Sequence, residues 1–297
     1  MELSIIIVHY NTPELLRRCI STIVSSEPRC AYEIIVVDNG SKAEFRIKNK
    51  QVKIRHIQNK ENVGFGKANN QGAKIAQGKY LLFLNTDIEV IENAVTRLYE
   101  FINDRKDVSI AGAKLLNSDL SNQASCGMFY SLPVIFTMLF MQGDRLSITR
   151  YSPPVSRRVD WVSGACFIIR RADFHALKGF DEKMFMYMEE VELMLRARQK
   201  GMTVVYYPGA RFIHLGAATT KQTGDISLSP VVNIFHGLLY VYQKHRPLRE
   251  QNLLCAMLLT KARLSRIIAV LIGNRRMAEV YVHAEKAVLS GTSRTIF

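Results

Sequence analysis

The chain has 297 residues, of which 48% are hydrophobic and 22% are charged, and these are the proportions of an ordinary globular protein. This length excludes a small peptide scaffold and allows one large domain or two modest domains with a real core. The formal net charge of +14 is unusually high and indicates an anionic partner, such as a nucleotide, a diphosphate, an anionic lipid or a nucleic acid.

Cysteine usage and the start of the chain predict a cytoplasmic protein. The five cysteines are scattered and none forms a CxxC pair, which argues against a zinc knuckle and a disulfide framework. A strand-like run begins at residue 3, without the basic and long apolar regions of a signal peptide. Residues 132–141 are too short to span a membrane, and basic residues interrupt residues 253–272.

The first half of the chain alternates short apolar runs with amphipathic segments. The apolar runs predict strands at residues 4–8, 33–37, 52–57, 80–84 and 108–113. The segments between them predict helices at residues 13–25, 66–77 and 91–103. Repeated strand–helix units with short connections indicate an α/β fold with a mostly parallel sheet between helices.

The second half is less regular. Residues 117–154 are expected to be largely loop, with a partly apolar stretch, and such long loops are often functional lids. Residues 161–214 predict strands at 161–169, 203–207 and 211–214 and helices at 172–177 and 189–200. Three further helices are expected at residues 230–244, 249–272 and 275–289. We therefore divide the chain into a catalytic domain at 1–225 and a helical extension at 226–297.

The helix expected at residues 249–272 is amphipathic and basic. At about 100° per residue its large apolar side chains share one side, and they are Leu253, Leu254, Met257, Leu258, Leu264, Ile267, Ile268, Leu271 and Ile272. Arg263 and Arg266 fall opposite, and Lys261 lies within the stripe. Such a helix suits the surface of an anionic membrane. The stripe equally suits packing on the rest of the chain or on a second subunit.

Asp87 ends the most informative stretch, residues 80–87. A short apolar run stops abruptly at Asn85-Thr86-Asp87, which predicts a buried strand that delivers a carboxylate to its carboxyl end. Ligands of open α/β sheets bind just outside this edge. A hard divalent cation needs only one or two protein carboxylates when substrate phosphates complete its shell. A cap of the following helix or turn is the alternative.

Three other places have side chains suited to a nucleotide site. Asp38 follows a predicted strand, and its carboxylate can accept a hydrogen bond from the imide N–H of a pyrimidine, although Asp-Asn-Gly is also a common turn. His214 ends a predicted strand and is either a metal ligand or a structural histidine. Residues 62–67 resemble a phosphate-binding loop only weakly, because the dinucleotide and Walker spacings are absent.

A cluster of glutamates opens the helix expected at residues 189–200. Glu189, Glu190 and Glu192 are favoured there by the helix dipole and need have no other role. Three carboxylates within four residues also repel one another, which raises the pKa of at least one of them. A carboxyl with a raised pKa suits a general base.

Taken in this order, the motifs resemble glycosyltransferase family 2, whose members have a GT-A-type fold. Within the family they resemble the rhamnosyltransferase-like branch of bacterial surface-polysaccharide enzymes. The resemblance covers residues 3–220. It is carried by residues 4–11, 35–41, 62–66, 69–72, 84–87, 179–182 and 188–193, and by Gly164, Arg196 and His214.

The resemblance implies a role for each matching position. Glu190 stands where the family has its catalytic base, and Glu189 is the second candidate because the usual Asp is replaced by Glu. Asp87 stands in the family's Asp-x-Asp and would bind Mg²⁺ or Mn²⁺, with His214 as an additional ligand. The donor nucleotide and its diphosphate would contact Asp38, Asn11, Asn62, Gly64, Asn70, Asn85, Asp87 and Gly164.

The implied activity is a metal-dependent, inverting transfer from a nucleoside diphosphate sugar, dTDP-rhamnose or a UDP-sugar. The acceptor would be a saccharide or lipid-linked saccharide of cell-surface polysaccharide synthesis. The enzyme would be cytoplasmic or peripheral on the inner face of the membrane, and a homodimer is compatible with the sequence.

Two other functions are weighed against this one. A sugar nucleotidyltransferase needs a glycine-rich loop after the first strand, where residues 9–13 contain no glycine. A non-catalytic basic protein would bind nucleic acid or membrane, but the basic residues are dispersed rather than clustered with aromatic residues, which argues against nucleic acid.

Overall fold

The computed structural model describes residues 1–42, 51–216 and 229–293. These residues form two compact units. The first unit contains the described residues within Met1–Phe129, Arg150–Phe185 and Glu189–Thr219, and the second contains those within Tyr130–Thr149, Met186–Met188 and Thr220–Phe297.

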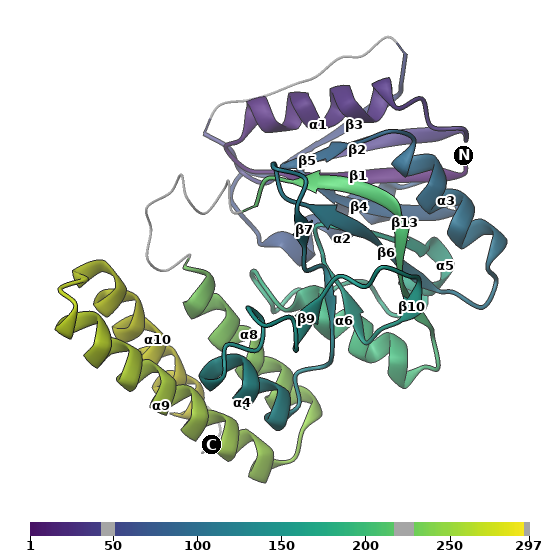
Figure 1. Ribbon diagram of the computed structural model, residues 1–297. Coiled ribbons are helices and arrows are strands. Elements are labelled where there is room, and N and C mark those ends of the chain that lie inside the picture. Colours follow the sequence, from purple (N-terminus) through teal and green to yellow (C-terminus); the bar gives the residue numbers. More distant parts are fainter. Residues whose placement is uncertain (43–50, 217–228, 294–297) are drawn as a thin grey trace. The chain divides into compact units, whose positions relative to one another are not determined.

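The first unit is built on a sheet to which ten strands of the described chain belong (Figure 1). Its main path is β10 (Arg157–Arg158), β13 (Val204–His214), β6 (Ile110–Leu116), β12 (Cys166–Arg170), β4 (Tyr80–Asn85), β1 (Leu3–His9), β2 (Tyr32–Asp38) and β3 (Ile54–Gln58). Off this path, β5 (Ile88–Val90) pairs with β13, and β7 (Asn122–Gln123) pairs with β6.

Most of the long strands of this sheet are parallel. β3, β2, β1 and β4 run parallel to one another, as do β6 and β13. β12 runs antiparallel between β4 and β6, and the short strands β5, β7 and β10 also pair antiparallel. The predicted α/β fold with a mostly parallel sheet is confirmed.

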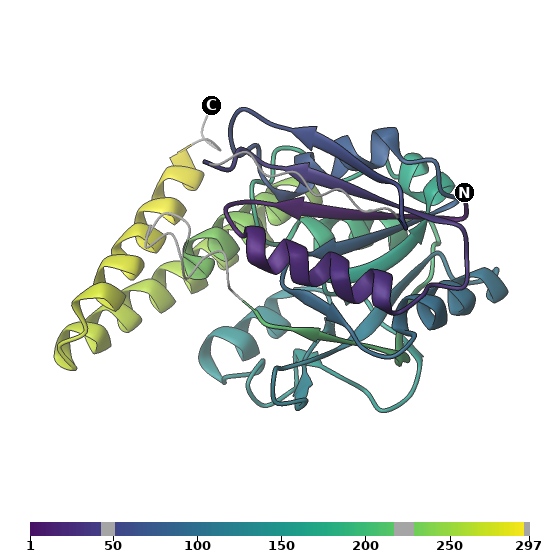
Figure 2. The ribbon, with the colours of Figure 1, turned by 90° about the horizontal axis from the view of Figure 1, so that it is seen from above.

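Helices cover both faces of the sheet. Side chains alternate between the faces along each strand, and the central strands are apolar at consecutive positions, so both faces have to be covered. The helices of this unit are α1 (Pro13–Ser25), α2 (Phe65–Ile75), α3 (Ala94–Asp104), α5 (Arg171–Ala176) and α6 (Glu189–Gln199). Ile5 and Ile7 of β1 share a buried core with α1 and α3, and Figure 2 shows α1 lying along the sheet. On the opposite face, Gly72 of α2 packs so closely on Ile6 that an added Cβ would lie 2.6 Å from its Cγ2.

Two strand predictions differ from the structure. Residues 161–169 form two strands: β11 (Trp161–Val162), which joins β8 (Cys126–Gly127) and β9 (Arg150–Tyr151) in a second sheet, and then β12. The strands expected at 203–207 and 211–214 are one strand, β13, with an irregularity between Tyr207 and Arg211. Pro208 lies within this irregularity and has no N–H to donate to the sheet, which explains the apparent gap.

The second unit is helical. It contains α4 (Leu132–Phe140), α8 (Pro230–His245), α9 (Leu248–Leu271) and α10 (Arg275–Ser293), so the three predicted C-terminal helices are confirmed. The Tyr242 hydroxyl of α8 donates to the carbonyl oxygen of Tyr130 at 2.9 Å, which ties the segment before α4 to α8. This unit therefore includes α4, from the segment expected to be loop. The division at residue 225 lies outside the described residues and stays a prediction.

Most of the apolar stripe predicted for α9 is not packed against the rest of the described chain. The buried residues of α9 are Leu254, Leu258, Ala262, Ser265 and Ala269, whereas six of the nine predicted stripe residues are exposed. Three of the buried residues of α9 are small, and α10, which packs against α9, buries the small side chains of Ala284 and Ala287. Arg263 and Arg266, expected on the opposite side, pair with Glu285 of α10.

None of the helices in the described part of the chain has the length and apolar character needed to cross a membrane.

Candidate active site

The carboxyl ends of three central strands bring the first predicted site residues to one edge of the sheet. His9 of β1 lies opposite Asp38 of β2, and Val8 lies opposite Asn85 of β4. Asp87 follows two residues after Asn85, at the turn into β5. The register of the parallel strands therefore places Asp38, Asn85 and Asp87 where ligands of α/β sheets bind.

His214 reaches this edge through a pairing that the sequence did not reveal. β5 pairs with the end of β13, so that Ile88 lies opposite His214. The carbonyl oxygen of Asp87 accepts a hydrogen bond from the N–H of Leu215 at 3.0 Å. As a result, His214 Nε2 lies 3.3 Å from Asp87 Oδ1, and their side chains are only 15% and 9% exposed. The two predicted metal ligands are thus adjacent.

Gln123 of β7 fixes the orientation of the His214 ring. Its amide nitrogen donates to Asn117 Oδ1 at 2.9 Å and to the His214 carbonyl oxygen at 3.2 Å. Its amide oxygen consequently faces His214 Nδ1, at 2.7 Å. The oxygen can only accept, so Nδ1 carries a proton, and the lone pair of a neutral ring is on Nε2. That lone pair then faces the Asp87 carboxylate, and the arrangement is favourable only with a proton or a cation between them.

This pair fits a divalent cation that is completed by substrate. No group of three or more histidine, cysteine, aspartate or glutamate side chains suited to a metal occurs among the described residues. The protein would therefore supply one oxygen and one nitrogen ligand, and diphosphate oxygens would supply others. A histidine ligand whose second nitrogen is hydrogen-bonded is the usual arrangement at metal sites.

Asp38 forms the expected turn with one carboxylate oxygen and leaves the other oxygen without a partner in the described part of the chain. Its Oδ1 accepts the backbone N–H of Ser41 at 2.8 Å, which closes the expected turn. Its Oδ2 is buried and has no hydrogen-bond partner among the described residues. A buried acceptor without a partner is unfavourable, so this oxygen is suited to a ligand that brings a donor. Asn11 lies on the same turn, because its N–H donates to Ser41 Oγ at 2.9 Å.

Polar side chains connect this turn to the Asn85-Thr86-Asp87 segment. Thr12 Oγ1 lies 3.3 Å from His9 Nδ1 and 3.3 Å from Thr86 Oγ1. Burial lowers the pKa of His9, and the Asp38 charge partly opposes this effect. No described residue hydrogen-bonds the Asn85 side chain, although its backbone N–H donates to Ala165 O at 3.0 Å. The Asn85 amide is therefore not used as a local cap.

The loop at residues 62–64 is held by an asparagine that sequence reasoning missed. Asn39 Nδ2 donates to Asn62 Oδ1 at 2.8 Å, and Asn39 Oδ1 accepts the N–H of Val63 at 3.1 Å. Gly64 has φ +90°, and an added Cβ would lie 2.7 Å from the Phe185 carbonyl oxygen. The loop is thus fixed beside Asp38, although a phosphate contact by Asn62 or Gly64 stays a prediction.

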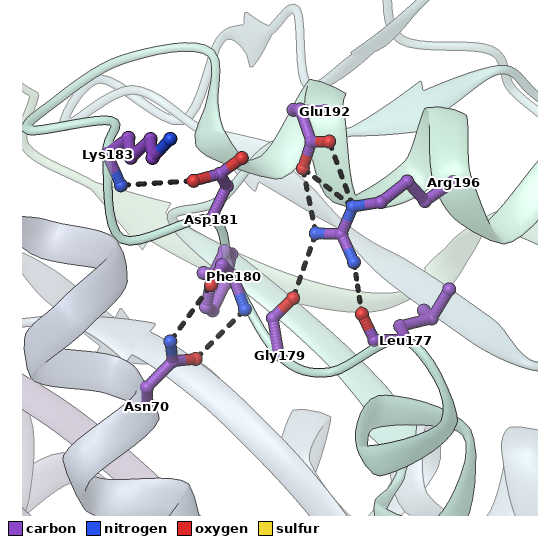
Figure 3. Close-up of polar contacts among 8 residues, drawn as sticks. All are labelled: Asn70, Leu177, Gly179, Phe180, Asp181, Lys183, Glu192 and Arg196. Carbon is purple, nitrogen blue, oxygen red and sulfur yellow. Dashed lines mark hydrogen bonds and ion pairs between the residues drawn. The ribbon is translucent and has the colours of Figure 1, made fainter. Parts of the chain in front are cut away.

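Asn70 and Glu192, one of the three clustered glutamates, make contacts that hold the fold together (Figure 3). The Asn70 amide donates to the carbonyl oxygen of Phe180 and accepts its N–H, both at 2.9 Å. Arg196 holds the buried Glu192 through both carboxylate oxygens, and it also donates to Gly179 O at 2.8 Å. These contacts fix the segment 177–182 against α2 and α6. Glu192 is therefore neutralised within the fold, and contact of Asn70 with the donor stays a prediction.

Glu189 and Glu190 have different surroundings at the start of α6. Glu189 is 5% exposed, and its burial, followed by the charge of Glu190, raises its pKa well above the ordinary value. Its Oε2 has no hydrogen-bond partner among the described residues. Glu190 is partly exposed, and its pKa is raised by desolvation, against the lowering effect of backbone hydrogen bonds and of the Arg150 charge. Glu190 is the accessible carboxyl of the two.

The pairing of β4 with β12 links Glu190 to the Asp87 edge. Asn85 bonds to Ala165, whose neighbour Gly164 has its N–H 3.5 Å from Glu190 Oε1. An added Cβ on Gly164 would lie 3.5 Å from Glu190 Cβ and Cδ, which is ordinary contact. Gly164 therefore adjoins the candidate base. A contact between Gly164 and the donor stays a prediction.

A solved structure has the same class of fold. The structure of GalNAc-T7 with UDP, GalNAc and Mn²⁺ superimposes with a TM-score of 0.60 at 21% identity, over 82% of this chain and 48% of that chain. The fold is thus of the GT-A type, with C-terminal helices. The sequence model of Glycosyl transferase family 2 matches residues 4–191, and the chain belongs to this family.

Relatives by sequence agree with the predicted rhamnosyltransferase-like branch. O-antigen biosynthesis protein RfbC of Myxococcus xanthus is 30% identical over 235 residues, which are 74% of this chain but 18% of RfbC. Rhamnosyltransferase WbbL of Escherichia coli K12 is 26% identical over 71% of this chain and 82% of its own length. N-acetylglucosaminyl-diphospho-decaprenol L-rhamnosyltransferase of Mycobacterium tuberculosis is 44% identical over 69 residues, 23% of this chain and 22% of that protein.

Proposed function

We propose that the protein is a metal-dependent, inverting glycosyltransferase that transfers a sugar from a nucleoside diphosphate sugar to a saccharide or lipid-linked acceptor in cell-surface polysaccharide synthesis. One observation carries the proposal: an accessible carboxyl with a raised pKa, Glu190, is linked through Gly164 and Ala165 to Asn85, two residues from the Asp87–His214 pair. Such a site has a base on one side and a place for an anionic leaving group on the other.

The donor is bound at the Asp38 end of the site in this proposal. The free Oδ2 of Asp38 accepts the imide N–H of the base. Uracil and thymine share this group, so both UDP-sugars and dTDP-sugars fit. The names of the rhamnosyltransferase relatives favour rhamnose as the sugar, and the family resemblance then favours dTDP-rhamnose as the donor.

Asp87 and His214 would hold the cation, and their mixed oxygen and nitrogen set favours Mn²⁺ over Mg²⁺, which prefers oxygen ligands. When bound, the cation neutralises charge on the departing diphosphate as a Lewis acid. Gln123 keeps Nε2 of His214 turned toward this position.

Glu190 removes the proton from the acceptor hydroxyl while the oxygen attacks the anomeric carbon, on the face opposite the departing diphosphate. A raised pKa makes its carboxylate a stronger base than an ordinary glutamate. Burial and the charge of Glu190 raise the pKa of Glu189 well above its ordinary value, which favours its neutral form, so we assign the base to Glu190. The raised pKa of Glu190 also predicts that activity declines on the acidic side at a higher pH than an ordinary carboxylate would give.

Two isosteric variants test the assignment of the base. Glu190→Gln is expected to lower kcat by roughly 10²–10⁴-fold, the usual contribution of a general base, while calorimetry shows unchanged donor binding. Glu189→Gln is the matched control and is expected to keep most of the turnover, because the raised pKa of Glu189 already favours a neutral side chain. Turnover is measured as release of dTDP, UDP or GDP from a panel of donor sugars. Wild-type turnover of Glu190→Gln would refute the assignment.

The stereochemical part of the proposal has a separate readout. An inverting transfer gives a product whose anomeric configuration is opposite to that of the donor, which proton NMR of the product resolves. Retention of configuration would contradict a single displacement with Glu190 as base.

A further inference from the structure

The turn between α9 and α10 carries exposed apolar side chains. We call this group the hairpin tip, and it consists of Ile267, Ile268, Val270, Leu271, Ile272 and Met277, which are between 41% and 79% exposed. Figure 1 shows α9 and α10 side by side, joined at this turn. The last residues of α10 lie at the other end of the hairpin.

The shape of the hairpin tip is that of an apolar end rather than an apolar face. Residues 267–272 are consecutive, and at about 100° per residue they occupy the whole circumference of the helix. Of these six, Ala269 alone is buried. A stripe on one side would suit packing against another helix. An apolar end exposed on every side except that of Ala269 suits immersion in an apolar layer.

Two free cations lie directly beside this end. Arg275 and Arg276 are exposed, follow the turn at Gly273, and have no ion-pair partner among the described residues. By contrast, Arg263 and Arg266 are paired with Glu285. Apolar side chains with a basic border are typical of helices that enter the interface of anionic bilayers.

The turn is closed, so the hairpin tip is a fixed surface and not a frayed helix end. The N–H of Ile272 donates to Ile268 O at 3.0 Å, and the N–H of Asn274 donates to Ala269 O at 2.8 Å. Arg263 Nε lies 2.8 Å and Arg266 Nη1 lies 2.9 Å from the carboxylate oxygens of Glu285. These bonds hold α10 against α9 and present the apolar residues together.

We propose that the hairpin tip inserts into the headgroup and acyl boundary of an anionic phospholipid bilayer, with Arg275 and Arg276 contacting the lipid phosphates. The protein then attaches to the membrane peripherally through this end of the second unit. The proposal rests on the exposed surface alone and not on the proposed sugar transfer.

Binding of the full chain to vesicles tests the apolar part. Phosphatidylcholine vesicles with and without phosphatidylglycerol are floated through a density gradient with the protein. The wild type is expected to float with the anionic vesicles. The double variant Leu271→Ser and Ile272→Ser should lose about tenfold or more in partitioning, because it removes two aliphatic side chains that the bilayer would bury. Leu253→Ser is the control, because Leu253 is also exposed, at 52%, but lies near the other end of α9 and should partition as the wild type does.

The arginines are tested in the same assay. Arg275→Gln with Arg276→Gln should weaken binding on the order of tenfold or more at low salt, since each basic residue near an anionic surface contributes roughly fivefold. Arg249→Gln, at the start of α9, is the control and should have little effect. Circular dichroism checks that each variant is folded.

Two results would overturn the proposal. One is a wild-type chain that ignores anionic vesicles at low salt. The other is sedimentation equilibrium that shows a dimer dissociated by the Leu271 and Ile272 substitutions, since the hairpin tip would then be a contact between two copies of the chain.

Discussion

Replacement of Gln123 by methionine tests whether the orientation of His214 depends on its amide. Methionine has nearly the same length and no hydrogen-bonding amide. The substitution removes three contacts: 2.7 Å to His214 Nδ1, 3.2 Å to the His214 carbonyl oxygen and 2.9 Å to Asn117 Oδ1. Without the acceptor at Nδ1, the ring loses its fixed tautomer, and Nε2 is no longer held toward Asp87.

The structure gives two expected magnitudes for this change. At about 0.5–1.5 kcal/mol per hydrogen bond, and with Gln123 partly exposed, the free energy of unfolding should fall by only about 1–2 kcal/mol. Loss of a hydrogen-bonded partner of a metal-binding histidine typically lowers metal affinity about 10–100-fold. In free energy, a 10–100-fold loss of metal affinity is about 1.4–2.8 kcal/mol, which is comparable to the loss of stability, so the two effects are measured separately.

Electron paramagnetic resonance of free Mn²⁺ measures this affinity, with dTDP or UDP present to complete the ligand shell. Gln123→Glu retains an acceptor oxygen for Nδ1 and should bind Mn²⁺ at least as well as wild type. Asn117→Ala removes a contact of Gln123 but none of His214 and should change the affinity little. The reasoning is refuted if Gln123→Met binds Mn²⁺ like the wild type, or if Gln123→Glu loses as much as Gln123→Met.

Three further predictions concern the buried Glu189, the contact of Asp38 with the nucleotide base, and Gly64. The buried Glu189 binds its proton more tightly in the folded state than in the unfolded state, so wild-type stability falls as pH rises above the ordinary pKa of 4.5. Glu189→Gln should therefore be more stable than wild type in urea titrations at pH 8, with an advantage that vanishes below about pH 4. Asp38→Asn, whose amide nitrogen cannot accept the imide proton, should bind UDP and dTDP roughly tenfold or more weakly by calorimetry. Gly64→Ala should lower the unfolding free energy by about 1–3 kcal/mol, clearly more than Gly201→Ala, since Gly201 also has positive φ but its added Cβ meets nothing within 4 Å.

The central strands could be predicted because they are buried on both faces. β1, β2 and β4 each contain a continuous apolar run that stops at a polar last residue, a pattern that fixes both the strand and its functional edge. The pairing of Asp87 with His214 could not be predicted from such runs. It depends on β5, a strand of three residues, and on its distant partner β13. Short strands carry too few residues for any periodic signal.

The glutamate cluster shows a signal that was present but not used. Glu192 and Arg196 are four residues apart on one helix, the spacing at which opposite charges meet. That spacing is enough to distinguish Glu192 from the other two carboxylates by sequence. The difference between Glu189 and Glu190 has no such signal, because neighbouring residues differ in burial only through the packing of α6.

The large apolar residues of α9 did not show which side of this helix is buried. A helical wheel weights leucine and isoleucine most heavily, but three of the five buried residues of α9 are the small Ala262, Ser265 and Ala269. The leucines and isoleucines of the hairpin tip are then left in solvent. Such exposure is unfavourable for a protein alone in water, so the packing that leaves most of the predicted stripe exposed supplies the argument for a lipid surface.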